Sequence, residues 1–358
     1  MTTRACGAAL LGAALALSAC SSGAVNLPVP PPSSGERVYV ANQAGATVSV
    51  LDIESMEVVQ TIDLQALGFS ANAKPHHIVV EPSGDHWYLS MIGENTVLKF
   101  DRNGAIAGRA SFAVPGMMAE DPSGERLYVG RSMAAVNPPH SIGTIRTSDM
   151  SIDEIDVFFP RPHALAVHPD GRHVFSGSLA ENRLLSIDVP EEAQELVSVD
   201  GPVHTFVQFA VSPDGNTMVV STQMTGRLLF YDVSDPMRPR QVDNLDIGGQ
   251  VWHPLFTPDG RYIYVGSKGT NTITIVDARS RSVAKVLRDD RISGPHGTAV
   301  SADGRYVFVT QSVPDMSGAG SSLAGGNSVA VIDVARQEIV RFVDVGREPS
   351  GIGTRPAS

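Results

Sequence analysis

Short hydrophobic runs alternate with polar turns along almost the whole chain. Runs such as "WYLSM", "RLYVG", "YIYVG" and "YVFVT" are rich in β-branched and aromatic residues, and Gly, Asn and Asp separate them. This alternation is typical of β-strands that are joined by tight turns. No stretch shows the 3.6-residue spacing of an amphipathic helix. The pattern therefore predicts an all-β domain.

One turn motif recurs at nearly even intervals. It occurs as "EPSG", "DPSG", "HPDG", "SPDG", "TPDG" and "SADG", at Pro82, Pro122, Pro169, Pro213, Pro258 and Ala302. The intervals are 40, 47, 44, 45 and 44 residues. Each turn precedes a hydrophobic run, a polar loop and further runs. A period in the forties with this content is the signature of a four-stranded propeller blade.

The two ends of the repeated region complement each other. "RVYVANQAGATVSVLD" (Arg37 to Asp52) matches the second and third strands of a blade, and "EPSGIGTRP" near the C-terminus matches a first strand. Together they complete a seventh blade, which leaves no open sheet edge. We therefore predict one domain over residues 37–356. It is an all-β, seven-bladed β-propeller of four-stranded antiparallel blades, closed by its N- and C-terminal strands.

The N-terminal segment has the features of an export signal. Arg4 precedes an apolar run that is too short to span a bilayer as a helix, and "LSAC" (Leu17 to Cys20) follows. "LSAC" resembles the bacterial lipoprotein signal, which implies cleavage after residue 19 and a lipid on Cys20. Residues 20–36 are rich in Pro and Ser and are expected to form a tether. This predicts an exported lipoprotein on the periplasmic face of the outer membrane or on the cell surface.

Charge and cysteine content exclude several functions. The formal net charge is −11, and Lys and Arg form no blocks, which argues against a nucleic-acid partner. The mature chain keeps Cys20 alone, so an internal disulfide and cysteine catalysis are both excluded. The expected partners are the lipid anchor and an envelope protein, and the chain is expected to be a monomer.

Histidines cluster where the innermost strand of each blade begins. Because that strand precedes the recurring turn, its first residues lie at one mouth of the central channel, which we call the top face. Six imidazoles and one thioether are predicted there, from His76, His77, His163, His204, His253, His296 and Met117. Imidazole with thioether suits copper, and several imidazoles also suit zinc or iron. We predict a transition-metal site, with copper favoured over zinc or iron.

Other interpretations of these histidines stay open. Blades descend from one another, so a histidine can persist as a structural hydrogen bonder without a metal. The domain would then be a non-enzymatic scaffold for protein–protein interaction in the cell envelope. A third alternative is a propeller lactonase or lyase, in which channel histidines act as general acid and base.

Several further side chains are candidates by position. Lys268, Arg131 and Glu94 lie on or beside top loops and are candidate substrate contacts, and His140 ends an enlarged loop that could fold over the mouth. His86, His168 and His173 are expected to be turn or surface residues. The aspartates that end the third strands are expected to cap turns: Asp52, Asp101, Asp188, Asp232, Asp277 and Asp333.

Two resemblances extend these predictions. "YVAN" (Tyr39 to Asn42) followed by "TVSVLD" resembles the YVTN-type repeats of bacterial surface and periplasmic proteins, over residues 37–355. "PHH" at a channel mouth is similar to nitrous-oxide reductase and copper thiocyanate dehydrogenase, which implies a copper cluster held by channel histidines. This chain departs from them in lacking a separate copper domain. The propeller of cytochrome cd-type nitrite reductase is another resemblance and implies d-type haem as an alternative cofactor.

Overall fold

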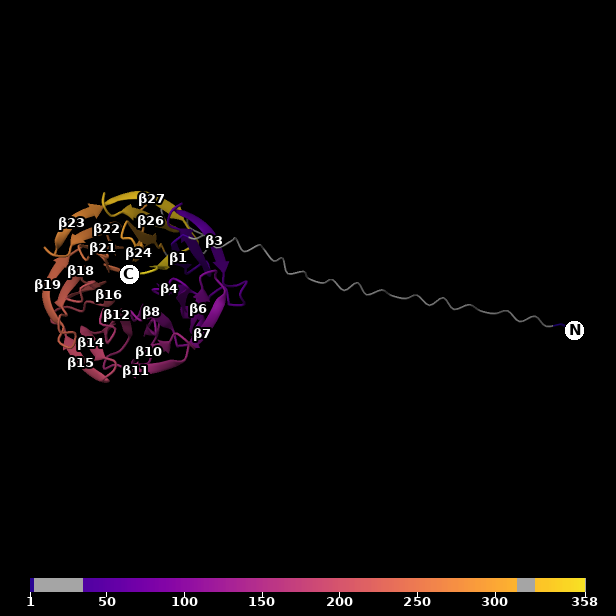
Figure 1. Cartoon of the computed structure of the whole chain (residues 1–358), viewed down its shortest axis with the longest axis horizontal. Coiled ribbons are helices and arrows are strands. Elements are labelled where there is room, and N and C mark those ends of the chain that lie inside the picture. The colour runs from indigo at the N-terminus through magenta and orange to yellow at the C-terminus, as the bar shows by residue number, and fades with distance from the viewer. Residues whose placement is uncertain (3–34, 314–325, 358) are drawn as a thin grey trace. The chain divides into compact units, whose positions relative to one another are not determined.

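Seven small antiparallel sheets stand around a ring in the computed structural model of the protein (Figure 1). The structure describes residues 1–2, 35–313 and 326–357, and the compact unit spans Ser34–Ser358. Each sheet has four strands, and one short 3-10 helix, η1 (Ile92–Glu94), interrupts the described β-structure. The predicted seven-bladed propeller is confirmed. Cys20 and nearly all of the predicted signal and tether lie outside the described residues.

The blades are numbered in chain order, each from its innermost to its outermost strand. Blade 1 contains β28 (Pro349–Thr354), β1 (Arg37–Asn42), β2 (Thr47–Asp52) and β3 (Glu57–Asp63), and blade 2 contains β4 (Pro75–Val80), β5 (His86–Met91), β6 (Thr96–Asp101) and β7 (Ile106–Ser111). Blade 3 contains β8 (Pro115–Glu120), β9 (Arg126–Arg131), β10 (Ser141–Arg146) and β11 (Ile152–Asp156), and blade 4 contains β12 (Pro162–Val167), β13 (His173–Ser178), β14 (Arg183–Asp188) and β15 (Ala193–Ser198). Blade 5 contains β16 (Phe206–Val211), β17 (Thr217–Thr222), β18 (Arg227–Asp232) and β19 (Arg240–Asp246). Blade 6 contains β20 (Leu255–Phe256), β21 (Tyr262–Ser267), β22 (Thr272–Asp277) and β23 (Ser282–Leu287), and blade 7 contains β24 (Pro295–Val300), β25 (Tyr306–Gln311), β26 (Ser328–Asp333) and β27 (Glu338–Asp344).

The first and last strands close the ring within blade 1. β28 pairs antiparallel with β1, in a register that places Val38 opposite Thr354 and Asn42 opposite Pro349. The backbone groups of β1 are thereby satisfied on both sides. This confirms the predicted closure and removes the sheet edge that an open ring would expose.

Large side chains fill the spaces between neighbouring blades. Tyr39 of blade 1 stacks on Trp87 of blade 2 with ring centres 4.7 Å apart, and Trp87 stacks on Phe100 at 4.2 Å. The Trp87 indole N–H donates to the Asp101 carbonyl, 3.0 Å away. Nearly every residue of the second strands, such as β1 and β5, is buried because each blade packs between two others. This explains the continuous β-branched and aromatic runs of the repeat.

The aspartates that end the third strands serve the turns, as predicted. Asp52 Oδ1 accepts from the backbone N–H of Ser55 at 2.8 Å, and Asp277 Oδ1 accepts from that of Ser280 at 2.8 Å. Asp101 Oδ1 accepts two backbone N–H groups, from Asn103 and Ala105, each at 2.9 Å. These carboxylates therefore stabilise local backbone and lie apart, each in a different blade.

A left-handed residue precedes most of the innermost strands. Lys74, Arg161 and Glu348 have φ of 50°, 55° and 53°, and each precedes a proline. The next residues form a bulge, because the register of β4 against β5 shifts between Pro75 and Ile78. Non-glycine residues with positive φ and bulges both re-aim side chains locally. Here the bulged residues include His76 and His77.

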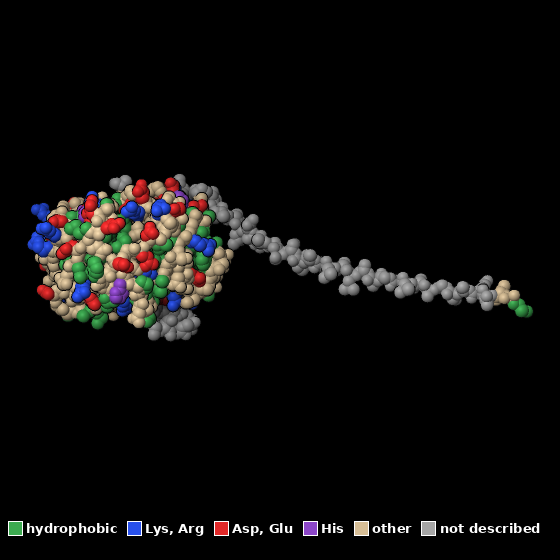
Figure 2. Space-filling view, turned by 90° about the horizontal axis from the view of Figure 1, so that it is seen from below, with side chains coloured by type: hydrophobic (Ala, Val, Ile, Leu, Met, Phe, Trp, Pro, Cys, Tyr) green, Lys and Arg blue, Asp and Glu red, His purple; other side chains and the backbone are tan. Residues whose placement is uncertain are grey.

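The side of the ring carries mixed charge. In Figure 2, acidic and basic side chains are interspersed over the visible face, without a large region of one sign. Within the described residues, no helix is both long and apolar enough to cross a membrane.

Candidate functional site

Five histidines from four blades meet in the channel at its top mouth. They are called the channel histidines: His76, His77, His163, His253 and His296. The rings of His77 (blade 2) and His253 (blade 6) have centres 6.0 Å apart, and those of His76 (blade 2) and His296 (blade 7) are 6.1 Å apart. These blades are not neighbours in the ring. Side chains of non-neighbouring blades come this close only when they point into the central channel.

An interruption in strand pairing just before β20 explains how blade 6 places His253 in the channel. Val251 bridges to Ser267 and the Trp252 N–H donates to the Gly266 carbonyl at 2.9 Å, but pairing resumes only at Leu255, so His253 and Pro254 leave the ladder. Pro254 has no N–H to offer the ladder. The His253 ring consequently lies 4.8 Å from the His296 ring, closer than the rings of the His77–His253 and His76–His296 pairs.

Hydrogen bonds fix the tautomers of three channel histidines. His163 Nδ1 donates to the Arg131 carbonyl at 2.7 Å, and His76 Nδ1 donates to Gln43 Oε1 at 3.0 Å. In their neutral forms both therefore carry the lone pair on Nε2. His77 differs, because its Nδ1 accepts the Met118 backbone N–H at 3.3 Å and Nε2 carries the proton. The His296 Nδ1 atom is buried without a hydrogen-bond partner among the described residues.

Burial keeps these imidazoles neutral. The pKa of His76 and of His77 is lowered to about 3, mainly by burial and in smaller part by the proximity of His163. Burial also lowers the pKa of His163 to about 4, although the hydrogen bond to the Arg131 carbonyl opposes this shift. The pKa values of His253 and His296 lie well below the ordinary value, through burial and through neighbouring imidazoles and Lys268. The channel mouth thus offers lone pairs and N–H groups instead of imidazolium charges at neutral pH.

The ring spacings are compatible with a shared ion. Two imidazoles bound at about 2.0–2.1 Å to one metal have ring centres no more than roughly 6.3 Å apart. The three separations of 4.8, 6.0 and 6.1 Å fall within this limit. The donor set and the unpartnered His296 Nδ1 therefore fit a transition-metal ion. Among the described residues of the mouth, no three ligand atoms lie within 4.8 Å of one another, so side-chain rotation must accompany binding.

Lys268 adds the positive charge at this mouth. Its Nζ lies 4.4 Å from the centre of the Trp252 ring, and Trp252 in turn lies 5.2 Å from the His296 ring. Burial lowers the pKa of Lys268 to about 8, while Glu348 opposes the shift. Of the four candidate substrate contacts, Lys268 is the one that reaches the channel histidines. Trp252 was not predicted from the sequence, although it occupies the position equivalent to His76.

The other two predicted ligands, His204 and Met117, have different surroundings. His204 precedes the left-handed residue Thr205, so Phe206 occupies the place held by proline in other blades. Its Nδ1 pairs with Thr225 Oγ1 at 2.7 Å, and its ring stacks on Phe206. His204 is thus separated from the bulged positions that carry the channel histidines. Met117 occupies the position equivalent to His77 and is fully buried in β8.

The remaining candidate contacts serve other purposes. Arg131 is buried, its Nη2 lies 2.7 Å from Glu154 Oε2, and its guanidinium lies 3.6 Å from the Phe112 ring centre. The Arg131 carbonyl, and not its side chain, serves the site by accepting from His163. Glu94 accepts two hydrogen bonds from Ser70, and His140 is exposed.

A second histidine cluster lies on the opposite face, in the turn after β12. The ligand atoms of His168, Asp170 and His173 all lie within 4.8 Å of one another. The expectation that these histidines are plain turn or surface residues is incomplete, because His173 is buried and the His168 side chain is only 12% exposed. The sequence signal was available as the string "HPDGRH", in which a carboxylate lies between two imidazoles.

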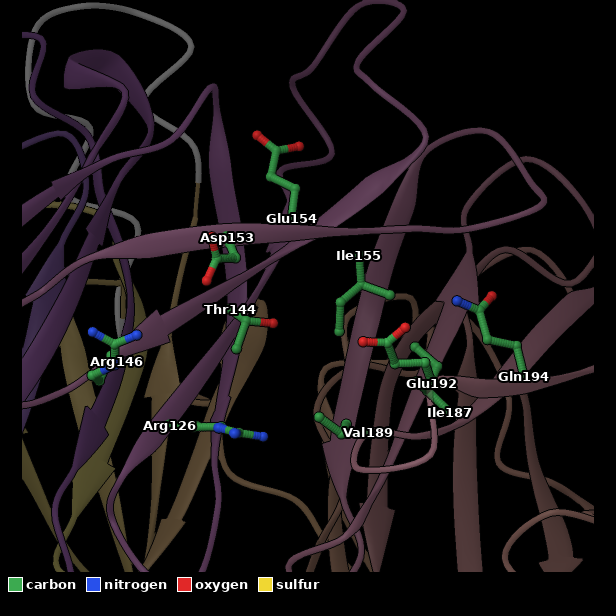
Figure 3. A pocket seen from close by; sticks show the side chains of 10 residues that line it. All are labelled: Arg126, Thr144, Arg146, Asp153, Glu154, Ile155, Ile187, Val189, Glu192 and Gln194. Atoms are coloured by element: carbon green, nitrogen blue, oxygen red, sulfur yellow. The ribbon is translucent and has the colours of Figure 1, made fainter.

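An open groove lies away from both histidine clusters. It lies between blades 3 and 4 and has a volume of about 600 Å³. Figure 3 shows Arg126 and Arg146 on one wall and Glu192 and Gln194 on the other. Its lining comes largely from middle and outer strands and their turns, and includes no channel histidine. The groove is open and lined by long polar side chains, without converging imidazoles.

The fold and the channel histidines define a seven-bladed β-propeller with a neutral, imidazole-lined mouth. No family model matches the chain. Over 192 residues the chain is 27% identical to an uncharacterised WD repeat-containing protein of Synechocystis; the match takes in 53% of this chain and 52% of that protein. The chain thus spans about half the length of this relative.

Other comparisons cover more of the chain at lower identity. The chain is 18% identical over 305 residues to the 6-phosphogluconolactonase of Yersinia pestis, a match that takes in 77% of this chain and 87% of the relative. Among solved structures it is similar to a functionally unknown protein from Desulfotomaculum acetoxidans (13% identity, 90% and 100% of the two chains, TM-score 0.71). It is also similar to hydrazine synthase of Kuenenia stuttgartiensis (20% identity, 78% and 89%, TM-score 0.64). These likenesses support the propeller fold.

Proposed function

We propose that this propeller binds a transition-metal ion through its channel histidines, with copper favoured over zinc or iron. The observation that carries the proposal is that imidazoles of non-neighbouring blades meet in the channel as buried or half-buried, neutral groups. Neutral imidazole is the form that binds metal, and several uncharged imidazoles in one place suit copper and zinc.

The hydrogen bonds around the mouth support the same proposal. A metal-binding histidine usually donates its other ring N–H to a carbonyl or carboxylate, which fixes the tautomer. His163 and His76 have this arrangement, to the Arg131 carbonyl and to Gln43 Oε1. His163, His76 and His296 would hold the ion, and a bound copper ion would supply one-electron chemistry or be the cargo itself. The Nε2–H of His77 and the ammonium of Lys268 would then orient an anionic or polar ligand beside the ion.

The test is metal analysis of the purified protein after copper loading and dialysis. We expect bound copper in the wild type, and at least a tenfold loss of affinity in His163→Gln and in His296→Gln. His140→Gln is the matched control, because it removes an exposed imidazole of the same face and leaves the channel unchanged. Equal copper content in all four proteins would refute the proposal. It would leave the envelope scaffold as the better account.

Similarity to 6-phosphogluconolactonases favours a second candidate, the hydrolysis of a lactone. A neutral channel histidine would then act as general base on water, and Lys268 would bind the anionic part of the substrate. The described histidine–carboxylate pairs, such as His86–Glu81, lie at the turn face and not in this mouth. Hydrolysis of 6-phosphogluconolactone by chelator-treated protein would support this candidate, because the metal-binding proposal predicts none.

We also propose that the chain is exported and lipid-anchored through Cys20. The proposal rests on the apolar run and "LSAC" in the sequence. The mass of the mature N-terminal peptide checks it: we expect a lipid-modified Cys20 in the wild type and an unmodified, unanchored chain in Cys20→Ser. An unmodified N-terminus in the wild type would contradict it.

A further inference from the structure

The turn that follows β12 departs from a pattern that three other turns share. In those turns a hydroxyl before the Pro or Ala donates to the aspartate two residues later. The distances are 2.5 Å for Ser212 to Asp214, 2.6 Å for Thr257 to Asp259 and 2.6 Å for Ser301 to Asp303. The hydroxyl proton neutralises part of the carboxylate charge and holds the turn.

His168 takes the place of that hydroxyl in blade 4. Its Nε2 donates to the Gly215 carbonyl at 2.9 Å, so the neutral ring carries a lone pair on Nδ1. Nδ1 accepts the backbone N–H of Asp170 at a long 3.3 Å and lies closer, 3.0 Å, to Asp170 Oδ2. Two acceptors therefore face each other where the other turns have a donor and an acceptor. Such a contact is repulsive unless a cation lies between the two atoms.

His173 completes a set of three ligands. Its Nδ1 lies 2.7 Å from the same Asp170 Oδ2, and the three ligand atoms lie within 4.8 Å of one another. Asp170 Oδ1 is already used by the backbone N–H groups of Arg172 at 2.8 Å and His173 at 3.1 Å. The carboxylate is thus held in place by Oδ1 and presents Oδ2 to both imidazoles.

We propose that His168, Asp170 and His173 bind a divalent transition-metal ion of the zinc class, separately from the channel site. Two imidazoles and one carboxylate are an established ligand set for zinc with one position left for water. Ligand atoms at about 2.0–2.1 Å from a tetrahedral ion lie roughly 3.3 Å apart, so the separations of 2.7 and 3.0 Å need to widen by only a few tenths of an ångström. The Asp170 side chain is 35% exposed, which gives the ion a path from solvent.

The surroundings supply partners for the second nitrogen of each ring. The Gly215 carbonyl of blade 5 already accepts from His168 Nε2, and Gly215 has φ of 73° with a Cβ position that would lie 2.8 Å from that nitrogen. His173 Nε2 lies 3.7 Å from Asp188 Oδ2, which can accept its proton once Nδ1 binds the ion. Hydrogen-bond partners of this kind orient metal-binding histidines.

The test measures zinc binding to the full chain carrying His163→Gln and His296→Gln. These substitutions weaken the channel site, so that the turn site can be measured by itself. Equilibrium dialysis with Zn²⁺ alone is expected to give one ion per chain and a rise in Tm. Adding His168→Ser restores the residue type of Ser212 and Ser301, so the turn should keep its stability while zinc affinity falls at least tenfold. His86→Ser, which removes the histidine of blade 2 that is equivalent to His173, should leave zinc binding unchanged.

A second comparison guards against damage from the channel substitutions. In the otherwise wild-type chain, His168→Ser should lower the bound zinc by one ion and leave copper bound at the channel unchanged. Undiminished zinc in His168→Ser would overturn the proposal, and so would the absence of zinc from the parent. If NMR then showed both nitrogens of His168 protonated at neutral pH, a proton and not a metal would occupy the contact. Failure of this test leaves the channel proposal intact, because that site is tested by His163→Gln and copper.

Discussion

His163 Nδ1 on blade 4 lies 2.7 Å from the carbonyl oxygen of Arg131 on blade 3, so a channel histidine is hydrogen-bonded to the peptide unit that follows a buried arginine. The Arg131 side chain donates to the Ala113 carbonyl at 2.9 Å and to Glu154 at 2.7 Å, which fixes that peptide unit. The position of the His163 ring thus depends on side-chain contacts between strands of the neighbouring blade.

Arg131→Gln should destabilise the fold by about 2–4 kcal/mol, because it removes buried hydrogen bonds and the contact with Phe112. Urea denaturation measures this loss. Arg183→Gln, which removes a half-exposed arginine paired with Glu181, should change stability by less than about 0.5 kcal/mol. Equal effects of the two substitutions would contradict the structural role of Arg131.

Acid should destabilise the metal-free protein in the range where the channel histidines of the unfolded chain titrate. The pKa values of His76 and His77 are about 3 in the fold and near 6.5 when unfolded, so the unfolded state binds protons first. Their stabilising effect is complete above pH 6.5 and is lost as pH falls toward 3. Urea midpoints at pH 7.5, 6.0 and 5.0 should fall steadily. Burial raises the pKa of Glu120 to about 8, and this single carboxyl opposes the trend between pH 8 and 5. A flat profile above pH 5 would contradict the neutral state of the channel histidines, which outnumber it.

Lys268→Met should stabilise the protein at neutral pH, by on the order of 1 kcal/mol. Burial lowers the pKa of Lys268 to about 8, which means that the fold disfavours its charge. For the same reason the wild type should gain stability as pH rises from 8 to 10, and the variant should not. Thermal melts at pH 7 and pH 9.5 measure both effects, with Lys285→Met on β23 as the control. A lower Tm for Lys268→Met at pH 7 would argue against this account.

Deleting residues 349–358 should abolish cooperative folding. The deletion removes β28 and exposes the buried edge of β1, including Val38 and Val40. Far-UV circular dichroism and soluble yield measure the outcome. Deleting only residues 356–358, which follow the last strand, should leave Tm unchanged. A soluble, cooperatively melting product of the longer deletion would show that the ring does not need its closing strand.

The architecture could be predicted from the sequence because each blade repeats the same turn and strand text. The channel site was partly predictable for the same reason: proline followed by histidine marks the start of an inner strand, at His76, His163 and His296. The prediction misplaced His204 relative to the start of the innermost strand of blade 5. There Phe206 replaces proline, and only the left-handed backbone of Thr205 marks where the strand begins. Trp252 was missed because the strand break around it has no regular sequence signal.

The cluster at the opposite face was missed for a different reason. His168 and His173 look like ordinary turn residues when each is taken alone. Their proposed capacity to bind a metal depends on the tautomer of His168, which the hydrogen bond to the Gly215 carbonyl of the next blade sets. A contact between blades, 47 residues apart in the chain, cannot be derived from the spacing within one turn.

The pairing of Val38 with Thr354 places both ends of the folded ring at the turn face, beneath blade 1. A fusion partner or a bead attached at either end would therefore start from the same edge of the disc. The imidazole-lined opening lies on the far side of that disc. Immobilised protein should accordingly bind metal ions or small ligands as well as free protein does, and a split reporter joined to the two ends would monitor the integrity of the ring.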